Sequence, residues 1–208
     1  LFKELIRTSV AMVNQQVLDY YDHQCHKQNP EPAACQYGYA LVLLNTNQYV
    51  RAQNILENLA TKYKDTIYFQ IALSEAEAGL KQYSKALERS EALQKNYPDN
   101  YAALMTHANV LIAANQPQSA ASILLKGFRR YKEDLPLCKM LARAQAQAKQ
   151  KSYAYFTQAQ CLLLEGQPRG SIAQLKVAQK LAKHDTYMTA RITAKIEEIK
   201  YRAEFDTR

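Results

Sequence analysis

A short motif recurs along the chain at a constant interval. Its copies occupy residues 48–52, 82–86 and 116–120, and each begins with Gln and ends with Ala. A fixed period of about 20–50 residues is typical of proteins that stack one supersecondary unit many times. The constant interval therefore predicts an array of similar units and constrains the fold more than any single residue.

The pattern within one unit predicts an amphipathic helix. Apolar residues recur at i, i+3, i+4 and i+7 at Ala52, Ile55, Leu56 and Leu59, which lines one face of a helix. One hairpin cannot cover that face by itself. We therefore expect the next hairpin to bury it and to extend a continuous core along the array.

Small residues stand midway along the preceding helix of each unit, at Ala40, Ser74 and Ala108. Together with the turn and the Ala that follows it, this pattern resembles the tetratricopeptide repeat, which has two antiparallel helices per unit. The resemblance implies an all-α, right-handed solenoid of antiparallel helix hairpins, with a capping helix at each end.

The turn glycine of that repeat family is replaced here by Asn47, Lys81 and Asn115. Asn tolerates the left-handed backbone conformation that such a turn can require, so two of the three replacements are mild.

The spacing predicts three regions. Residues 1–32 form an N-terminal capping helix and turn, residues 33–134 form three repeat units of equal length, and residues 135–208 form irregular repeat-like helices and a C-terminal cap. We expect the register to change after residue 134, with helices over 135–149, 152–165, 169–182 and 186–203. Because the first residue is Leu1 rather than Met, we also expect a missing upstream domain.

The charge is uneven: residues 105–208 hold 17 Lys and Arg against 8 Asp and Glu, in a chain of net charge +8. A basic half could meet nucleic acid, anionic lipid or an acidic protein. The charges are spread singly along predicted helices, which favours a solvated basic face and no nucleic-acid partner. No apolar run approaches the ~20 residues of a membrane span.

The chain lacks the sequence signatures of catalysis. It has no His-Glu-x-x-His, no Gly-x-Ser-x-Gly and no glycine loop for phosphate. His23, Cys25, His26 and Cys35 cluster, but their spacing matches no closed structural zinc site. We therefore expect no enzyme activity, metal or cofactor in this part of the protein.

The four cysteines are placed symmetrically about two predicted turns. Cys25 and Cys35 flank the turn at 28–32, and Cys138 and Cys161 flank the turn at 149–152. Mirrored residues of a helical hairpin can approach within the ~4.4–6.8 Å between Cα atoms that a disulfide requires. The sequence predicts two disulfides, with buried free thiols as the alternative.

The family's concave-face positions predict a groove that binds a protein or peptide. The candidate partner-binding residues are Tyr37, Leu41, Asn45, Tyr68, Glu75, Met105, Asn109, Tyr153 and Gln160. Aromatic and Met anchors with Asn suit a peptide, although a Tyr at helical spacing can equally belong to the core. The Lys and Arg clamp of chaperone-binding members is not reproduced, which disfavours an acidic C-terminal tail as ligand.

Residues 159–167, 173–178 and 187–192, with 97–101, carry a further resemblance. They resemble the C-terminal repeat domain of BepA-type (YfgC-type) periplasmic zinc metalloproteases. The resemblance implies a periplasmic docking module for the outer-membrane β-barrel assembly machinery, its substrates and its own protease domain. It places zinc and the metalloendopeptidase activity in the missing catalytic domain of the parent. The alternative is a stand-alone repeat scaffold or adaptor with no protease, in the cytoplasm.

Overall fold

The computed structural model describes residues 15–26 and 32–205, and all secondary structure there is α-helical. The chain divides between Ala114 and Asn115 into two compact units. The helices of the first unit are α2 (Gln15–His26), α3 (Ala33–Asn45), α4 (Tyr49–Lys62), α5 (Ile67–Gly79), α6 (Tyr83–Asn96) and α7 (Tyr101–Ala113). Those of the second unit are α8 (Pro117–Arg130), α9 (Leu135–Gln147), α10 (Lys151–Leu164), α11 (Pro168–Leu181) and α12 (Thr186–Phe205).

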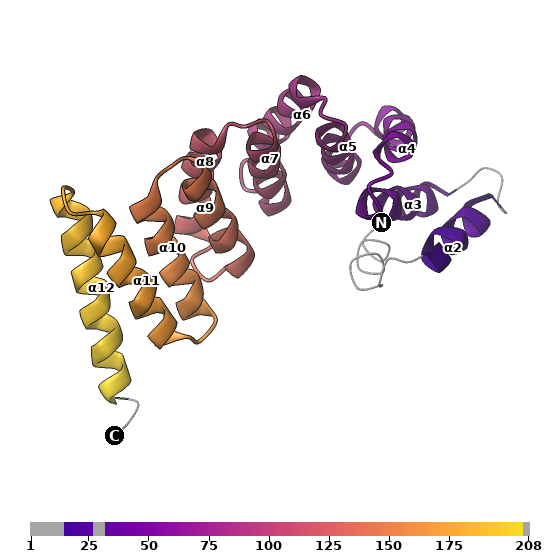
Figure 1. Ribbon diagram of the computed structural model, residues 1–208. Coiled ribbons are helices and arrows are strands. Elements are labelled where there is room, and N and C mark those ends of the chain that lie inside the picture. The colour runs from indigo at the N-terminus through magenta and orange to yellow at the C-terminus, as the bar shows by residue number, and fades with distance from the viewer. Residues whose placement is uncertain (1–14, 27–31, 206–208) are drawn as a thin grey trace. The chain divides into compact units, whose positions relative to one another are not determined.

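Within each unit, helices that follow one another in the chain pack side by side as antiparallel hairpins (Figure 1). One set of helices begins at residues 33, 67, 101 and 135, and the helices that follow them begin at residues 49, 83, 117 and 151. The helices therefore recur at the same interval as the sequence motif. The predicted all-α hairpin fold is confirmed. None of the described helices combines the length and apolarity that crossing a bilayer requires.

The turns that follow α3, α5, α7 and α9 each contain one residue in the left-handed backbone region. These residues are Asn47, Lys81, Asn115 and Lys149, with φ between 58° and 60°. In the first hairpin the Gln48 amide donates to the Leu43 carbonyl at 2.8 Å, a bond that closes the helix end in a Schellman motif. The turn therefore needs positive φ, and the sequence supplies it twice with Lys rather than Gly.

The regular repeat continues past residue 134, where we expected the register to change. The turn at Lys149 continues the repeat interval past residue 134, so the hairpin of α9 and α10 belongs to the regular series. The departure begins at Gly166, where φ is +72° and a short turn leads into α11. The helix α10 packs against both α9 and α11.

Small residues allow the paired helices to approach closely. The side chains of Ala40, Ser74 and Ala86 are completely buried, and the Ser74 hydroxyl donates to the Ala86 carbonyl at 3.3 Å. In the second unit, α12 buries Met188 and Ile192 against α11. The N-terminal capping helix expected within residues 1–32 is described only as α2, because residues 1–14 and 27–31 lie outside the described part.

One pair of repeat positions, with one member on each helix of a hairpin, changes its chemistry along the chain. Its occupants are Leu43 with Ile55, Glu77 with Arg89, and Gln145 with Thr157. Glu77 is 1% exposed and accepts two bonds from the Arg89 guanidinium, at 2.9 and 3.0 Å. The Thr157 hydroxyl donates to the Gln145 side-chain oxygen at 2.7 Å. An ion pair and a hydrogen bond thus occupy positions that are aliphatic in the first hairpin.

Candidate functional site

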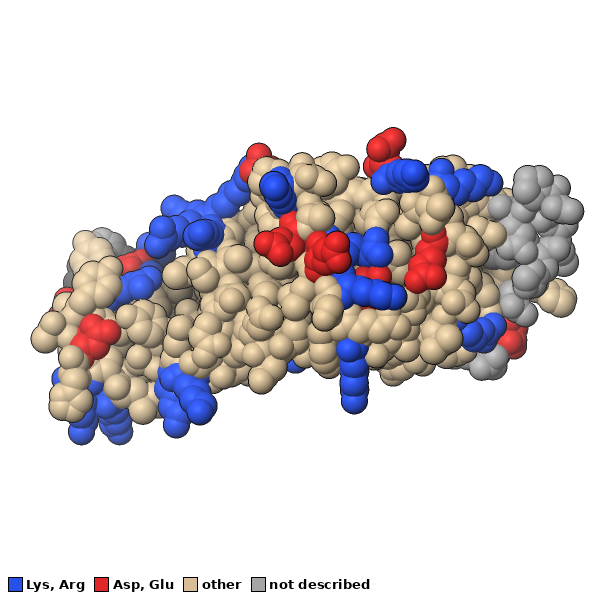
Figure 2. Space-filling model, turned by 90° about the horizontal axis from the view of Figure 1, so that it is seen from above, with Lys and Arg blue, Asp and Glu red and all other residues tan. Residues whose placement is uncertain are grey.

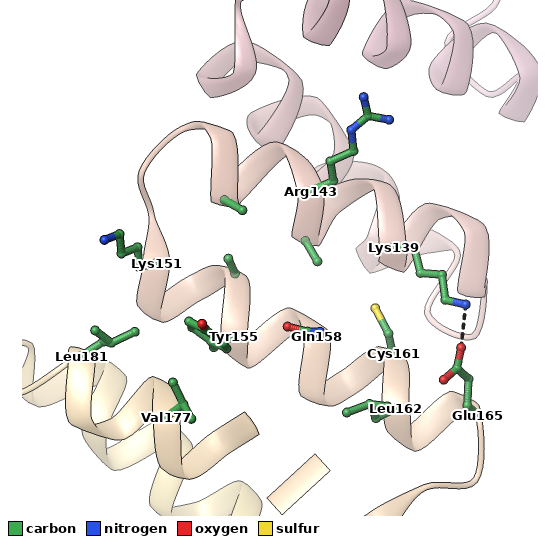
Figure 3. Close-up of a pocket in the computed structure, with 13 residues that line it drawn as sticks. Lys139, Arg143, Lys151, Tyr155, Gln158, Cys161, Leu162, Glu165, Val177 and Leu181 are labelled. Atoms are coloured by element: carbon green, nitrogen blue, oxygen red, sulfur yellow. Dashed lines mark ion pairs between the residues drawn. The ribbon is translucent and has the colours of Figure 1, made fainter. Parts of the chain in front are cut away.

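In the second unit, a groove of about 850 Å³ runs over α10 between α9 and α11 (Figure 3). Its apolar lining consists of small and aliphatic side chains: Ala142, Ala146, Ala154, Leu162, Val177 and Leu181. Three cationic side chains, Lys139, Arg143 and Lys151, line it as well, together with Tyr155, Gln158, Cys161 and Glu165. We call this hollow the α9–α11 groove.

Helical periodicity brings these side chains to one side. On α9 the lining residues are Lys139, Ala142, Arg143 and Ala146, at the i, i+3, i+4, i+7 spacing of a single helix face. The alanines leave space that larger side chains would fill. The charged and apolar parts of the lining therefore come from the same face of the helix.

The charges of the groove are only partly balanced. The Lys139 ammonium lies 2.6 Å from the Glu165 carboxylate, which links the start of α9 to the end of α10 (Figure 3). Within the described residues, Arg143 and Lys151 have no ion-pair partner. Residues 115–208 hold 17 Lys and Arg against 8 Asp and Glu. In Figure 2, the left end, where the C-terminal helices lie, shows mainly blue basic side chains.

A disulfide lies at the groove. Cys138 on α9 and Cys161 on α10 are joined, with their Cα atoms 5.7 Å apart, and both side chains are buried. This is one of the two pairings predicted from symmetry about a turn. Cys35 is also disulfide-bonded, but the side chain of Cys25, its predicted partner, lies outside the described residues.

In the first unit, the structure brings together three of the predicted groove residues. Tyr37 is buried and its ring packs edge-on against Phe69, with centroids 5.3 Å apart. Burial, then the nearby Glu75 carboxylate and then Tyr68 raise the pKa of Tyr37 to about 12. Neighbouring protein atoms remove part of the water around the Glu75 carboxyl group and so raise its pKa as well. Part of the Glu75 side chain remains exposed.

The other predicted residues of the first unit differ in exposure. Leu41 and Met105 are half-buried, whereas Asn45 and Asn109 are exposed and Tyr68 is 42% exposed. Tyr37 therefore serves mainly as core. Tyr68 and Asn109 remain accessible to a partner.

Tyr153 and Gln160 do not line the α9–α11 groove. The Tyr153 hydroxyl instead donates to Asp185 at 3.3 Å, near the start of α12. Burial and the Asp185 carboxylate raise the pKa of Tyr153. The groove is lined by Tyr155 and Gln158, because residues two apart on a helix point to different sides.

Sequence reasoning missed Lys139 and Arg143. They occupy the repeat positions of Met105 and Asn109, one unit further along the chain, and extending the period by one unit would have found them. The sequence also offered His23, Cys25, His26 and Cys35 as a cluster to test for zinc binding. The described part of the chain holds no cluster of three or more His, Cys, Asp and Glu side chains suited to a metal. The side chains of Cys25 and His26 lie outside it.

No model of a known protein family matches the chain. A curated relative, the Beta-barrel assembly-enhancing protease of Escherichia coli (strain K12), is 24% identical over 187 residues. The match covers 90% of this chain but only 38% of that protein, so the chain spans little more than a third of the relative's length.

Solved structures match over most of the chain. MamA (41-end) of Desulfovibrio magneticus RS-1 has a TM-score of 0.57 at 17% identity, and the match covers 82% of this chain and 96% of that one. YrrB, described as a TPR protein with an unusual peptide-binding site, has a TM-score of 0.56 at 15% identity, with coverage of 86% and 91%. The fold is that of a tetratricopeptide-repeat protein. The sequence also resembles the assembly-enhancing protease.

Proposed function

We propose that this chain is a protein-docking module, the tetratricopeptide-repeat part of a periplasmic protease that acts in outer-membrane protein assembly. The observation that carries the proposal is the similarity of 90% of the chain to the Beta-barrel assembly-enhancing protease. The helical array supplies exposed side chains and a groove for a partner, which suits recognition rather than chemistry.

The disulfide supports the periplasmic location. A pairing such as Cys138–Cys161 persists in oxidising compartments and is rare in the cytosol of mesophiles. On this proposal the zinc and the peptidase activity belong to another domain of the parent polypeptide. The repeats bring the assembly machinery, its substrates or that protease domain into place.

Site-specific photocrosslinking in the intact parent protein tests the proposal. A photoreactive residue at Arg143 or Tyr155 in the groove, and at Tyr68 or Asn109 in the first unit, should yield adducts with a component of the β-barrel assembly machinery. The control is Lys126 on α8, which is exposed and does not line the groove. Equal adducts from Lys126, or none from the four test positions, would refute docking through these surfaces.

A stand-alone repeat scaffold is the second candidate. It is favoured by the match to YrrB, a TPR protein of whose solved chain 91% is covered. The coding sequence upstream of Leu1 separates the two proposals. A His-Glu-x-x-His segment there supports the protease, and its absence supports the scaffold.

A further inference from the structure

The helices α3, α5, α7 and α9 carry different chemistry at equivalent repeat positions. At two of these positions, the successive occupants are Tyr37, Ile71, Met105 and Lys139, and Leu41, Glu75, Asn109 and Arg143. In the described hairpins, only α9 carries a cation at either position. The basic character of the α9–α11 groove is therefore a local property of this unit, and a repeat consensus does not explain it.

Cationic and apolar side chains line the same groove from different helices, and in Figure 3 the Arg143 side chain extends away from α10, at the rim of the groove. Arg143 and Lys151 have no ion-pair partner among the described residues, and Lys139 is held by Glu165, the only acidic side chain in the described lining. Val177 and Leu181 are both partly exposed at the opposite wall, 37% and 47%. A ligand that fits must offer carboxylates on one side and apolar side chains on the other.

We propose that the α9–α11 groove binds an acidic, amphipathic segment of a protein partner. The ligand's carboxylates pair with Arg143 and Lys151, and its apolar side chains pack on Val177 and Leu181 over the space left by the alanines. Charge complementarity selects the ligand and steers it to the groove. The proposal rests on the docking function above and adds the chemistry of the docked segment.

The groove's cations meet side-chain carboxylates in this arrangement, so a free C-terminus is not required. An internal segment of the partner can therefore bind as well as a terminal one. An amidated peptide tests this point directly.

Fluorescence anisotropy with the purified chain provides the first test. The probes are a labelled, C-terminally amidated peptide of alternating Glu and Leu, the same peptide with Gln for Glu, and the same peptide with Lys for Glu. The Glu peptide should bind about tenfold or more tighter than the Gln peptide, and its affinity should fall as salt rises. Equal affinity for Glu and Gln peptides, or tighter binding of the Lys peptide, overturns the inference.

Charge reversal locates the site. Arg143→Glu with Lys151→Glu should weaken binding of the Glu peptide at least about tenfold. The matched control, Lys126→Glu with Lys200→Glu, changes the net charge of the unit equally at exposed positions outside the groove, and should change affinity less than about twofold. Equal losses in both pairs would show general attraction and overturn the inference.

A neutral variant keeps the test independent of charge. Ala146→Phe fills the groove from an exposed position, so the protein should stay folded, as checked by circular dichroism, while the Glu peptide loses binding. Unchanged binding in folded Ala146→Phe places the peptide elsewhere and overturns the inference.

Two further probes distinguish a peptide ligand from nucleic acid or anionic lipid. Combined with crosslinking, they also distinguish a failure of this inference from a failure of the proposed docking function. If an oligonucleotide or phosphatidylglycerol vesicles bind in an Arg143- and Lys151-dependent way and the Glu peptide does not, the groove is not a peptide site and the inference fails. If no peptide binds but the parent still crosslinks through Arg143 and Tyr155, the inference fails and docking stands. Loss of both signals refutes both.

Discussion

The ion pair between Glu77 and Arg89 can be replaced by the aliphatic pair found at the same positions one repeat earlier. We expect Arg89→Ile alone to lower the free energy of unfolding by about 3 kcal/mol, because it leaves a carboxylate that is 1% exposed without its cation. Glu77→Leu alone should cost less, about 1–2 kcal/mol, since the Arg89 side chain is 29% exposed and can reach water.

The double variant Glu77→Leu with Arg89→Ile copies Leu43 and Ile55. Replacing a buried ion pair by packed apolar residues is often neutral or stabilising, so we expect the double variant to lie within about 1 kcal/mol of the wild type. The two single losses then exceed the double loss, and the double-mutant cycle should report a coupling energy of about 3 kcal/mol or more.

Chemical denaturation of the wild type, both single variants and the double variant measures these energies. The transplant Leu43→Glu with Ile55→Arg is the matched control. It should be more stable than Leu43→Glu alone, because the second substitution supplies the missing cation. If the double variant at 77 and 89 is no more stable than Arg89→Ile, positions across the hairpin do not act as a pair and the reasoning is wrong.

Three other expectations concern the disulfide, the turns and Glu75. The Cys138–Cys161 disulfide joins residues with a sequence separation of 23. Its loss should lower the free energy of unfolding of the second unit by about 3 kcal/mol. An unchanged denaturation midpoint in the variant Cys138→Ala with Cys161→Ala would contradict this. Lys81→Gly and Lys149→Gly each remove a side chain from a residue with positive φ and should each raise the free energy of unfolding by about 0.5 kcal/mol, net of the entropy of Gly. The control Lys176→Gly, at an exposed position in the interior of α11, should lower it. Denaturation of the three variants checks the two signs. The raised pKa of Glu75 means that the folded chain binds this proton more tightly than the unfolded chain, so its contribution to stability is present below the unfolded pKa and is lost as pH rises through the folded pKa. Glu75→Gln should therefore gain stability relative to the wild type between acid and neutral pH, and a difference that does not change with pH would exclude this linkage.

The repeat could be predicted from the sequence because it rests on local, periodic signals. The apolar stripe that begins at Ala52 specifies a helix that must pack against another helix. Small residues such as Ala40 and Ala86 let the packed helices approach each other. The turn residues Asn47 and Asn115 were predicted to tolerate a left-handed backbone, and both have positive φ. These features depend on residues close together in the chain.

The groove could not be predicted in the same way. The motif recurs once more at residues 150–154, again from Gln to Ala, but we expected the register to change after residue 134. The hairpin of α9 and α10 was therefore predicted without being aligned to the repeat, and Lys139 and Arg143 were missed. Which face of α10 is open also depends on α11 packing against it after the short turn at Gly166.

The period, the helices and their small-residue contacts are encoded in the order of the residues, because they follow from side-chain spacing along one chain. Which side chains share a surface is a property of the packed helices. Tyr37 lies in the core against Phe69, Tyr153 bonds to Asp185, and Tyr155 lines the groove. A helix presents several faces of similar composition, and the neighbouring helices determine which of them water reaches.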